Sequence, residues 1–160
     1  MSTNSATPPA SAGQEQPFSI KSIIGPVMAV VVGMIMVILD STVINVAMPN
    51  LIEYFGSTLT MMQWSITAYT LALSAVIPLA GWLTDRFGAK QIFLITIVLF
   101  TLGSVLCSLA QTPEQLVLFR VIQGLGGGMV APIGMAIIFK LAPPDKQGSI
   151  MGVLGVPMML

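Results

Sequence analysis

The sequence carries very little charge. Only 8% of its 160 residues are charged, and six Lys and Arg residues are matched by six Asp and Glu residues. An average soluble domain is about 25% charged, so a soluble fold of this size would lack the charges that cover its surface. Because the net charge is zero and no basic tract is present, nucleic acid is not an expected partner.

Histidine is absent from the chain, and Cys107 is its single cysteine. These two absences exclude zinc sites, disulfide frameworks and catalytic pairs of Ser or Cys with His. We therefore expect no metal, no cofactor and no enzymatic activity. The abundant residues point elsewhere, since 55% are hydrophobic and the mean hydropathy is +0.93. Such a composition indicates a membrane protein.

Apolar runs long enough to cross a bilayer recur along the chain, since a transmembrane helix needs about 20 mostly apolar residues. They predict an all-α integral membrane protein with helices at about residues 24–48, 61–83, 91–110 and 116–139. A fifth apolar run covers residues 148–160 and would rise only about 20 Å as a helix, so we expect a truncated fifth helix. Residues 1–20 are rich in Ser, Thr, Pro, Ala and Gln and predict a disordered tail before a partial bundle at 21–160.

The basic residues predict how the chain crosses the membrane. Five of them fall in the tail or next to alternate connections: Lys21, Arg86, Lys90, Lys140 and Lys146. The other connections, at about residues 49–60 and 111–115, contain neither Lys nor Arg. The positive-inside rule then places the N-terminus of this multi-pass protein, and with it the tail, in the cytoplasm.

Asp40 and Arg120 are charged residues well inside predicted helices, where each is energetically costly. Counted from the outer helix ends at roughly 1.5 Å per residue, Asp40 lies about 12 Å deep and Arg120 about 8 Å deep. We expect the two side chains to share one level and to neutralise each other. Two interpretations remain open. The pair either only orders the bundle or forms an ion or proton site, because burial opposes ionisation of a carboxyl whereas a neighbouring Arg favours it.

Polar residues form a stripe along one face of the second predicted helix. They follow the helical spacing i, i+4, i+7 and i+11: Gln63, Thr67, Thr70 and Ser74. The faces of the first and fourth helices that contain Asp40 and Gln123 also carry small or polar residues. Three such faces predict a water-accessible cavity lined by Gln63, Thr67, Thr70 and Gln123. The alternative is hydrogen bonding between helices without any pathway.

The stretch GLGGGM, Gly124 to Met129, lacks the G-x-G-x-x-G spacing of a nucleotide-binding loop and lies within an apolar run of transmembrane length. Gly124 and Gly128 instead form a G-x-x-x-G pair, which lets a neighbouring helix approach closely. We therefore predict helix packing at this face rather than nucleotide binding.

The connection GWLTDRFGAK, Gly81 to Lys90, joins the second and third predicted helices. Gly81 permits tight packing at the helix end, and Gly88 suits a turn with positive φ. Asp85 is placed to face the N-terminus of a neighbouring helix, where partial positive charge favours it. Arg86 and Lys90 anchor the connection on the cytoplasmic side. By these residues alone it is an ordinary short basic turn.

Four segments resemble the motifs of one family and occur in the family's order. They are LDSTVINVAMP (Leu39 to Pro49), QWSITAYTLA (Gln63 to Ala72), GWLTDRFGAK and RVIQGLGGG (Arg120 to Gly128). They are similar to the motifs of helix one, helix two, the loop between helices two and three, and helix four of drug:proton antiporters. The chain thus resembles the N-terminal part of a major facilitator superfamily transporter of the fourteen-helix EmrB/QacA type. The glycine- and proline-rich helix-five motif of these antiporters belongs around or just beyond Leu160.

The resemblance implies a multidrug efflux transporter, driven by proton antiport, in a bacterial plasma or inner membrane. Asp40 would carry the proton, and Arg120 would couple it to conformation. The loop would form a cytoplasmic latch between two halves of the transporter, through Gly81, Asp85, Arg86, Gly88 and Lys90. The partners would be lipid, protons, a lipophilic and often cationic substrate, the C-terminal part of the same transporter and a periplasmic adaptor. A transporter of a specific metabolite in the same superfamily and a small non-transporting membrane protein are the alternatives.

Overall fold

The computed structural model describes residues 20–141 together with Gly148 and Gly152. Four helices make up this part of the chain: α1 (Ile20–Phe55), α2 (Leu59–Phe87), α3 (Ala89–Ser108) and α4 (Pro113–Leu141). Each is long and apolar enough to cross a membrane, and no strand occurs between residues 20 and 141. The predicted all-α membrane fold is confirmed. Apart from single residues, the predicted tail and the predicted fifth helix lie outside the described residues.

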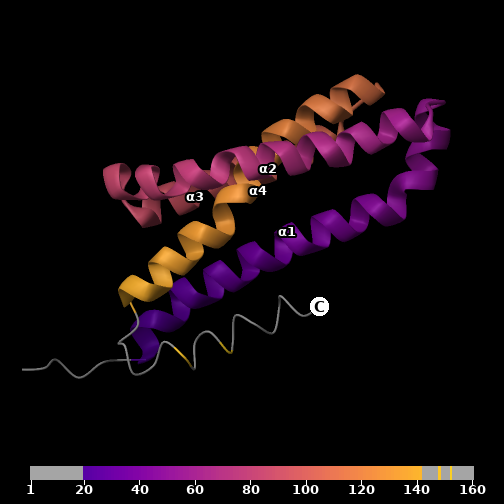
Figure 1. The fold of residues 1–160 in the computed structure, drawn as a ribbon. Helices are drawn as coiled ribbons and strands as arrows, with labels where there is room; N and C mark the ends of the chain where they lie inside the picture. Colours follow the sequence, from indigo (N-terminus) through magenta and orange to yellow (C-terminus); the bar gives the residue numbers. More distant parts are fainter. Residues whose placement is uncertain (1–19, 142–147, 149–151, 153–160) are drawn as a thin grey trace, which may run out of the picture.

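Each helix coincides with a predicted segment, and three of the four are longer than predicted. α1 continues through Pro49 to Phe55, α2 continues to Phe87, and α4 begins at Pro113. Hydropathy detects only the stretch that lies in hydrocarbon. The backbone hydrogen bonds of a helix, by contrast, continue into the headgroup region until a residue breaks them. A proline inside a helix bends it without necessarily ending it. Figure 1 shows the last turns of α1 bending away from the axis of the rest.

α4 is the central helix of the described bundle. It packs against α2 and α3, and α1 contacts the other helices chiefly through α4. In Figure 1, α4 crosses α2 and α3 and then runs toward the beginning of α1. The apolar span of α4 is 56% buried, against 28% or less in the other three helices. α4 therefore holds the bundle together.

Two apolar clusters lie at different levels of the bundle. One contains Val30 of α1 and Ile133 of α4, both almost fully buried. The other contains Met62 of α2 and Leu116 of α4. Arg120 lies between Leu116 and Ile133 along α4, so the charged side chain is enclosed by apolar packing on both sides, which keeps it out of bulk water.

The outward faces of the helices are apolar. Val46 of α1 is 75% exposed, Leu71 of α2 62%, Val98 of α3 57% and Leu118 of α4 59%. So much exposed apolar surface is rare on soluble monomers. Lipid is the solvent that these faces fit.

A single residue, Gly88, separates α2 from α3. Its φ is 88°, which confirms the predicted positive φ. Its N–H donates to the carbonyl oxygen of Thr84 at 3.0 Å, and its own carbonyl oxygen accepts from the N–H of Ile92 at 3.2 Å. The predicted loop from Gly81 to Lys90 was too long, because no residue before Gly88 breaks the helical hydrogen bonding of α2.

The connections also predict the sidedness of the chain. Gly56 and Thr112 lie between α1 and α2 and between α3 and α4, whereas Lys90 directly follows the connection at the opposite ends of α2 and α3. Because basic residues gather at this second end, we expect a reporter fused after Lys90 to be cytoplasmic. Fusions after Gly56 and Thr112 should report the outside, measured with alkaline phosphatase and a fluorescent protein. The reverse pattern would overturn the orientation. The predicted cytoplasmic fusion site after Lys146 lies outside the described residues.

Candidate functional site

Asp40 of α1 and Arg120 of α4 form an ion pair, with 2.6 Å between Asp40 Oδ2 and Arg120 Nη1. The Asp40 side chain is 15% exposed and the Arg120 side chain 5%. Removing two charges from water is costly, and breaking such a pair leaves an uncompensated charge. The pairing expected from the two depths is therefore present, and it ties α1 to α4.

Gln123, almost one turn further along α4, holds the second oxygen of the carboxylate. Its Nε2 donates to Asp40 Oδ1 at 2.7 Å, and Arg120 Nη1 also donates to Gln123 Oε1 at 3.3 Å. From α3, the Cys107 thiol donates to the same Gln123 Oε1 at 3.4 Å. Gly103 of α3 makes room for this glutamine, since a Cβ there would lie 2.6 Å from the Gln123 Cα. Both oxygens of Asp40 thus accept a hydrogen bond from α4.

Tyr69 of α2 completes the cluster, although no sequence pattern described above singles it out. The Cζ atom of Arg120 lies 5.4 Å from the centroid of the Tyr69 ring, within the range of a cation–π contact. Tyr69 is 7% exposed, and its hydroxyl has no hydrogen-bond partner among the described residues. The position of Tyr69 along the predicted helix is nevertheless unusual for a tyrosine. Tyrosines of transmembrane helices gather at the membrane interfaces, whereas Tyr69 lies well inside α2.

The polar stripe of α2 lies on another face of that helix. Gln63, Thr67 and Thr70 are exposed. The Thr67 hydroxyl donates to the carbonyl oxygen of Gln63 at 3.1 Å, and the Thr70 hydroxyl donates to that of Ile66 at 2.9 Å. The structure therefore brings Tyr69, and not this stripe, to the ion pair. That the stripe lines a pathway stays a prediction.

Glycines of α4 allow α2 to approach closely. A Cβ on Gly124 would lie 2.5 Å from the carbonyl oxygen of Tyr69, and a Cβ on Gly128 would clash with the carbonyl oxygen of Leu73. Side chains at these positions would force the two helices apart. The G-x-x-x-G pair thus lies in the contact between α2 and α4. Gly124 lies near the level of the ion pair, and Gly128 lies about one helical turn further along α4.

The predicted latch residues, unlike Gly124 and Gly128, do not lie in a packed contact between described helices. Gly81 is exposed, and a Cβ built there meets no described atom within 4 Å, so the tight packing expected at Gly81 is not found among the described residues. Asp85, Arg86 and Lys90 are also exposed. These side chains are accessible at the α2–α3 end of the bundle, and their role as a latch stays a prediction.

A cavity of about 230 Å³ lies between α1 and α4. Its apolar lining includes Val37 and Ile38 of α1 and Gly127 and Val130 of α4. Val37 precedes Asp40 by about one helical turn. Along α1 the lining of this cavity thus ends near Asp40, which is not itself one of its lining residues.

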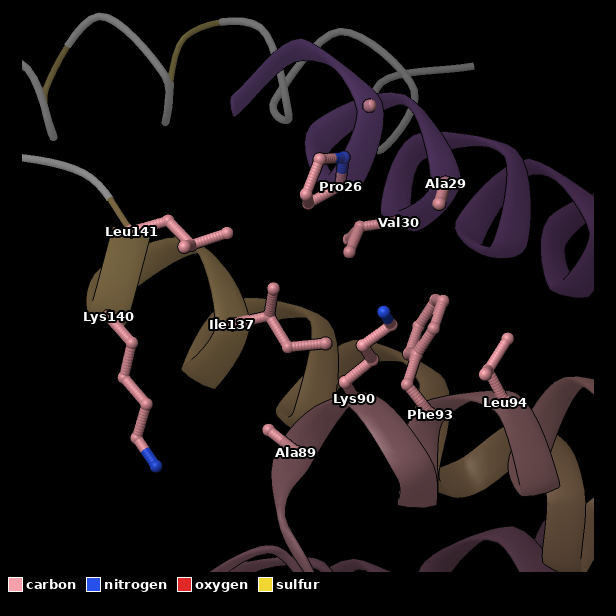
Figure 2. Close-up of a pocket in the computed structure, with 11 residues that line it drawn as sticks. Pro26, Ala29, Val30, Ala89, Lys90, Phe93, Leu94, Ile137, Lys140 and Leu141 are labelled. Carbon is pink, nitrogen blue, oxygen red and sulfur yellow. The ribbon is translucent and has the colours of Figure 1, made fainter. Parts of the chain in front are cut away.

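A larger cavity of about 560 Å³ lies where the beginnings of α1 and α3 meet the end of α4. Figure 2 shows Pro26 and Val30 on one side, Ile137 on another, and the Lys90 side chain reaching in between them. Val30 is about 15 Å along α1 from Asp40. This cavity is therefore separate from the ion pair, which we take as the candidate site.

Among the described residues, a helical bundle with apolar outer faces and a charged network between its crossing helices defines a multi-pass membrane protein with a candidate functional site inside the membrane. The comparison with known families agrees, because the Major Facilitator Superfamily matches residues 30–160. The chain belongs to this superfamily.

Several relatives of the chain are named for drug resistance. It is 45% identical over 130 residues to the Multidrug resistance protein B homolog of Mycobacterium tuberculosis. It is 40% identical over 129 residues to Multidrug resistance protein 3 of Bacillus subtilis, and 40% identical over 125 residues to the Putative multidrug resistance protein MdtD of Yersinia enterocolitica. The matched regions cover 81%, 81% and 78% of this chain. They cover 24%, 25% and 27% of the relatives, so the chain spans about a quarter of their length.

Proposed function

We propose that this chain is the N-terminal part of a bacterial transporter that exports lipophilic, often cationic drugs in exchange for protons. The observation that carries the proposal is the buried network in which both oxygens of Asp40 are bound by Arg120 and Gln123. The names of three relatives support the substrate class, since each contains the words multidrug resistance protein.

In this proposal Asp40 is the proton site. A proton that binds Oδ2 neutralises the carboxylate and removes the negative charge that pairs with Arg120, while the guanidinium keeps its charge. The ionic link between α1 and α4 is then lost, and the two helices are free to take a different relative position. Release of the proton restores the link. Protonation is thereby converted into a choice between two arrangements of the bundle.

The apolar cavity between α1 and α4 supports binding of the substrate near the same level. Its lining by Val37, Ile38 and Val130 suits a lipophilic group. Substrate in this cavity would contact the two helices whose link depends on Asp40. Occupation of the cavity and protonation of the carboxylate would then influence the same helix contact.

The exposed end of α2 supports a latch against the second half of the transporter. In this proposal Asp85 faces a helix N-terminus of that half, Arg86 and Lys90 lie at the cytoplasmic surface, and Gly81 and Gly88 shape the segment. The N-terminus lies in the cytoplasm, and the membrane is a bacterial plasma or inner membrane. A periplasmic adaptor is a further proposed partner.

The proposal is tested with the complete transporter in everted membrane vesicles and with radiolabelled tetraphenylphosphonium as the lipophilic cation. When the lumen is made acidic, we expect the vesicles to accumulate the probe, because protons leaving the lumen drive its entry. An uncoupler should abolish this uptake, and vesicles without the transporter are the control. Accumulation that requires ATP and survives the uncoupler would contradict the proposal, as would no accumulation at all.

A further inference from the structure

Glycines of α4 hold Tyr69 in one place. The main chain of α2 rests on Gly124, where a Cβ would lie 2.5 Å from the Tyr69 carbonyl oxygen. The far end of the side chain rests on Gly127, where a Cβ would lie 3.0 Å from the Tyr69 hydroxyl. Because Gly124 and Gly127 have no side chains, both the main chain and the hydroxyl end of Tyr69 pack directly against α4. This packing places the ring beside Arg120.

The ring, and not the hydroxyl, is the part of Tyr69 that contacts the charge. Arg120 Cζ lies 5.4 Å from the ring centroid. The Tyr69 hydroxyl and Arg120 Nε are both buried without a hydrogen-bond partner among the described residues. No hydrogen bond from Tyr69 to the guanidinium is therefore made. The negative face of an aromatic ring attracts a cation most strongly where water is excluded.

Four groups, one from each helix, surround Arg120 or its partners: Asp40 of α1, Tyr69 of α2, Cys107 of α3 and Gln123 of α4. Proton uptake by Asp40 removes the negative charge that balances the guanidinium. Gln123 Oε1 is a neutral acceptor that Cys107 shares. Of these contacts between residues that the structure describes, the one with the Tyr69 ring depends on neither the proton nor a shared acceptor.

We propose that Tyr69 is a positioning residue. Its ring keeps the guanidinium of Arg120 in its present position while Asp40 carries a proton. The inference rests on the proposed function, since it assigns Tyr69 to the proton-loaded half of the transport cycle. In the substrate-loaded half Asp40 is ionised and holds Arg120 itself. Loss of the negative charge density on the face of the Tyr69 ring should therefore slow net proton-driven transport. The exchange of substrate for substrate should stay nearly unchanged.

The test compares Tyr69→Phe with Tyr69→pentafluorophenylalanine in the complete transporter, purified into proteoliposomes. The two side chains have almost the same shape, but fluorination removes the negative ring face. We expect Tyr69→Phe to keep both activities within about twofold of the unsubstituted protein, because the hydroxyl makes no bond. With the fluorinated ring, net uptake of tetraphenylphosphonium driven by a pH gradient should fall ~10-fold, which corresponds to about 1.4 kcal/mol. Exchange of labelled for unlabelled probe should stay within about twofold.

Tyr54→pentafluorophenylalanine is the matched control, because Tyr54 is 73% exposed on α1. It should leave both activities unchanged. Equal net uptake in the Phe and fluorinated variants at position 69 would overturn the positioning role. Loss of exchange in parallel with net uptake would also overturn it, since that result indicates a packing role. If the unsubstituted transporter shows exchange but no uptake driven by the pH gradient, the proposed function itself fails, and this outcome is seen before any variant is made.

Discussion

Replacing Asp40 by Asn is expected to abolish uptake of tetraphenylphosphonium driven by a pH gradient, down to the level of vesicles without the transporter. Asn has nearly the size of Asp, and its amide oxygen can still accept from Arg120, although its nitrogen cannot accept from Gln123 Nε2 as the carboxylate does. Asn binds no proton at physiological pH. We expect the variant to be inserted in the membrane and its binding of the probe to remain measurable. The measurement is the initial rate of uptake at equal amounts of protein.

The control for this variant is Glu53→Gln, which removes an exposed carboxylate from the same helix. It should transport like the unsubstituted protein. If Asp40→Asn still accumulates the probe with a pH gradient as the sole energy source, Asp40 is not the proton carrier.

The interpretation that the ion pair only orders the bundle predicts a different result. In that case Asp40→Asn and Arg120→Ala would each fail to fold, because a buried charge loses its partner. Replacement of both residues by apolar side chains would restore activity, as it often restores stability when a buried pair is removed completely. Activity in such a double variant would contradict the proton-site proposal.

Gly128→Leu is expected to destabilise the protein by about 3 kcal/mol, the upper part of the range for overpacked cores. The new Cβ would clash with the carbonyl oxygen of Leu73 and would lie 2.7 Å from Val76 Cγ1. A backbone oxygen cannot turn aside as a flexible side chain can, so α2 and α4 must separate. The measurement is thermal unfolding in detergent together with the amount of folded protein recovered from the membrane.

The matched control is Gly25→Leu, because Gly25 is exposed and a Cβ there meets no described atom within 4 Å. That substitution should cost far less stability than Gly128→Leu, because no close contact forms there; the gain in helix propensity over Gly is opposed by Pro26, whose ring crowds a Cβ on the preceding residue. Equal stability of the two variants would show that the close contact at Gly128 is not required for the fold.

The sequence alone determined the class of the fold, the four described helices and the likeness of their motifs to a transporter superfamily. The physical reason is that hydrocarbon thickness imposes a minimum length on each apolar run, whatever its neighbours are. It also determined the pairing of Asp40 with Arg120. Two opposite charges at similar depth in a medium without water are costly apart, so their depths along two helices were enough to predict their contact.

The tertiary structure decided which face of α2 meets the ion pair. Periodicity places Thr67 and Thr70 on one face of α2 and Tyr69 on another, but it does not tell which face turns toward α4. That rotation depends on the close approach of α2 to Gly124 and Gly128, more than fifty positions away along the chain. The ring contact with Arg120 follows from the same approach, whereas the second hydrogen bond to Asp40, from Gln123, depends on how α1 packs against α4. Unlike the charge pair, which matching depths predict, these contacts are set by the packing of whole helices, which local sequence patterns do not contain.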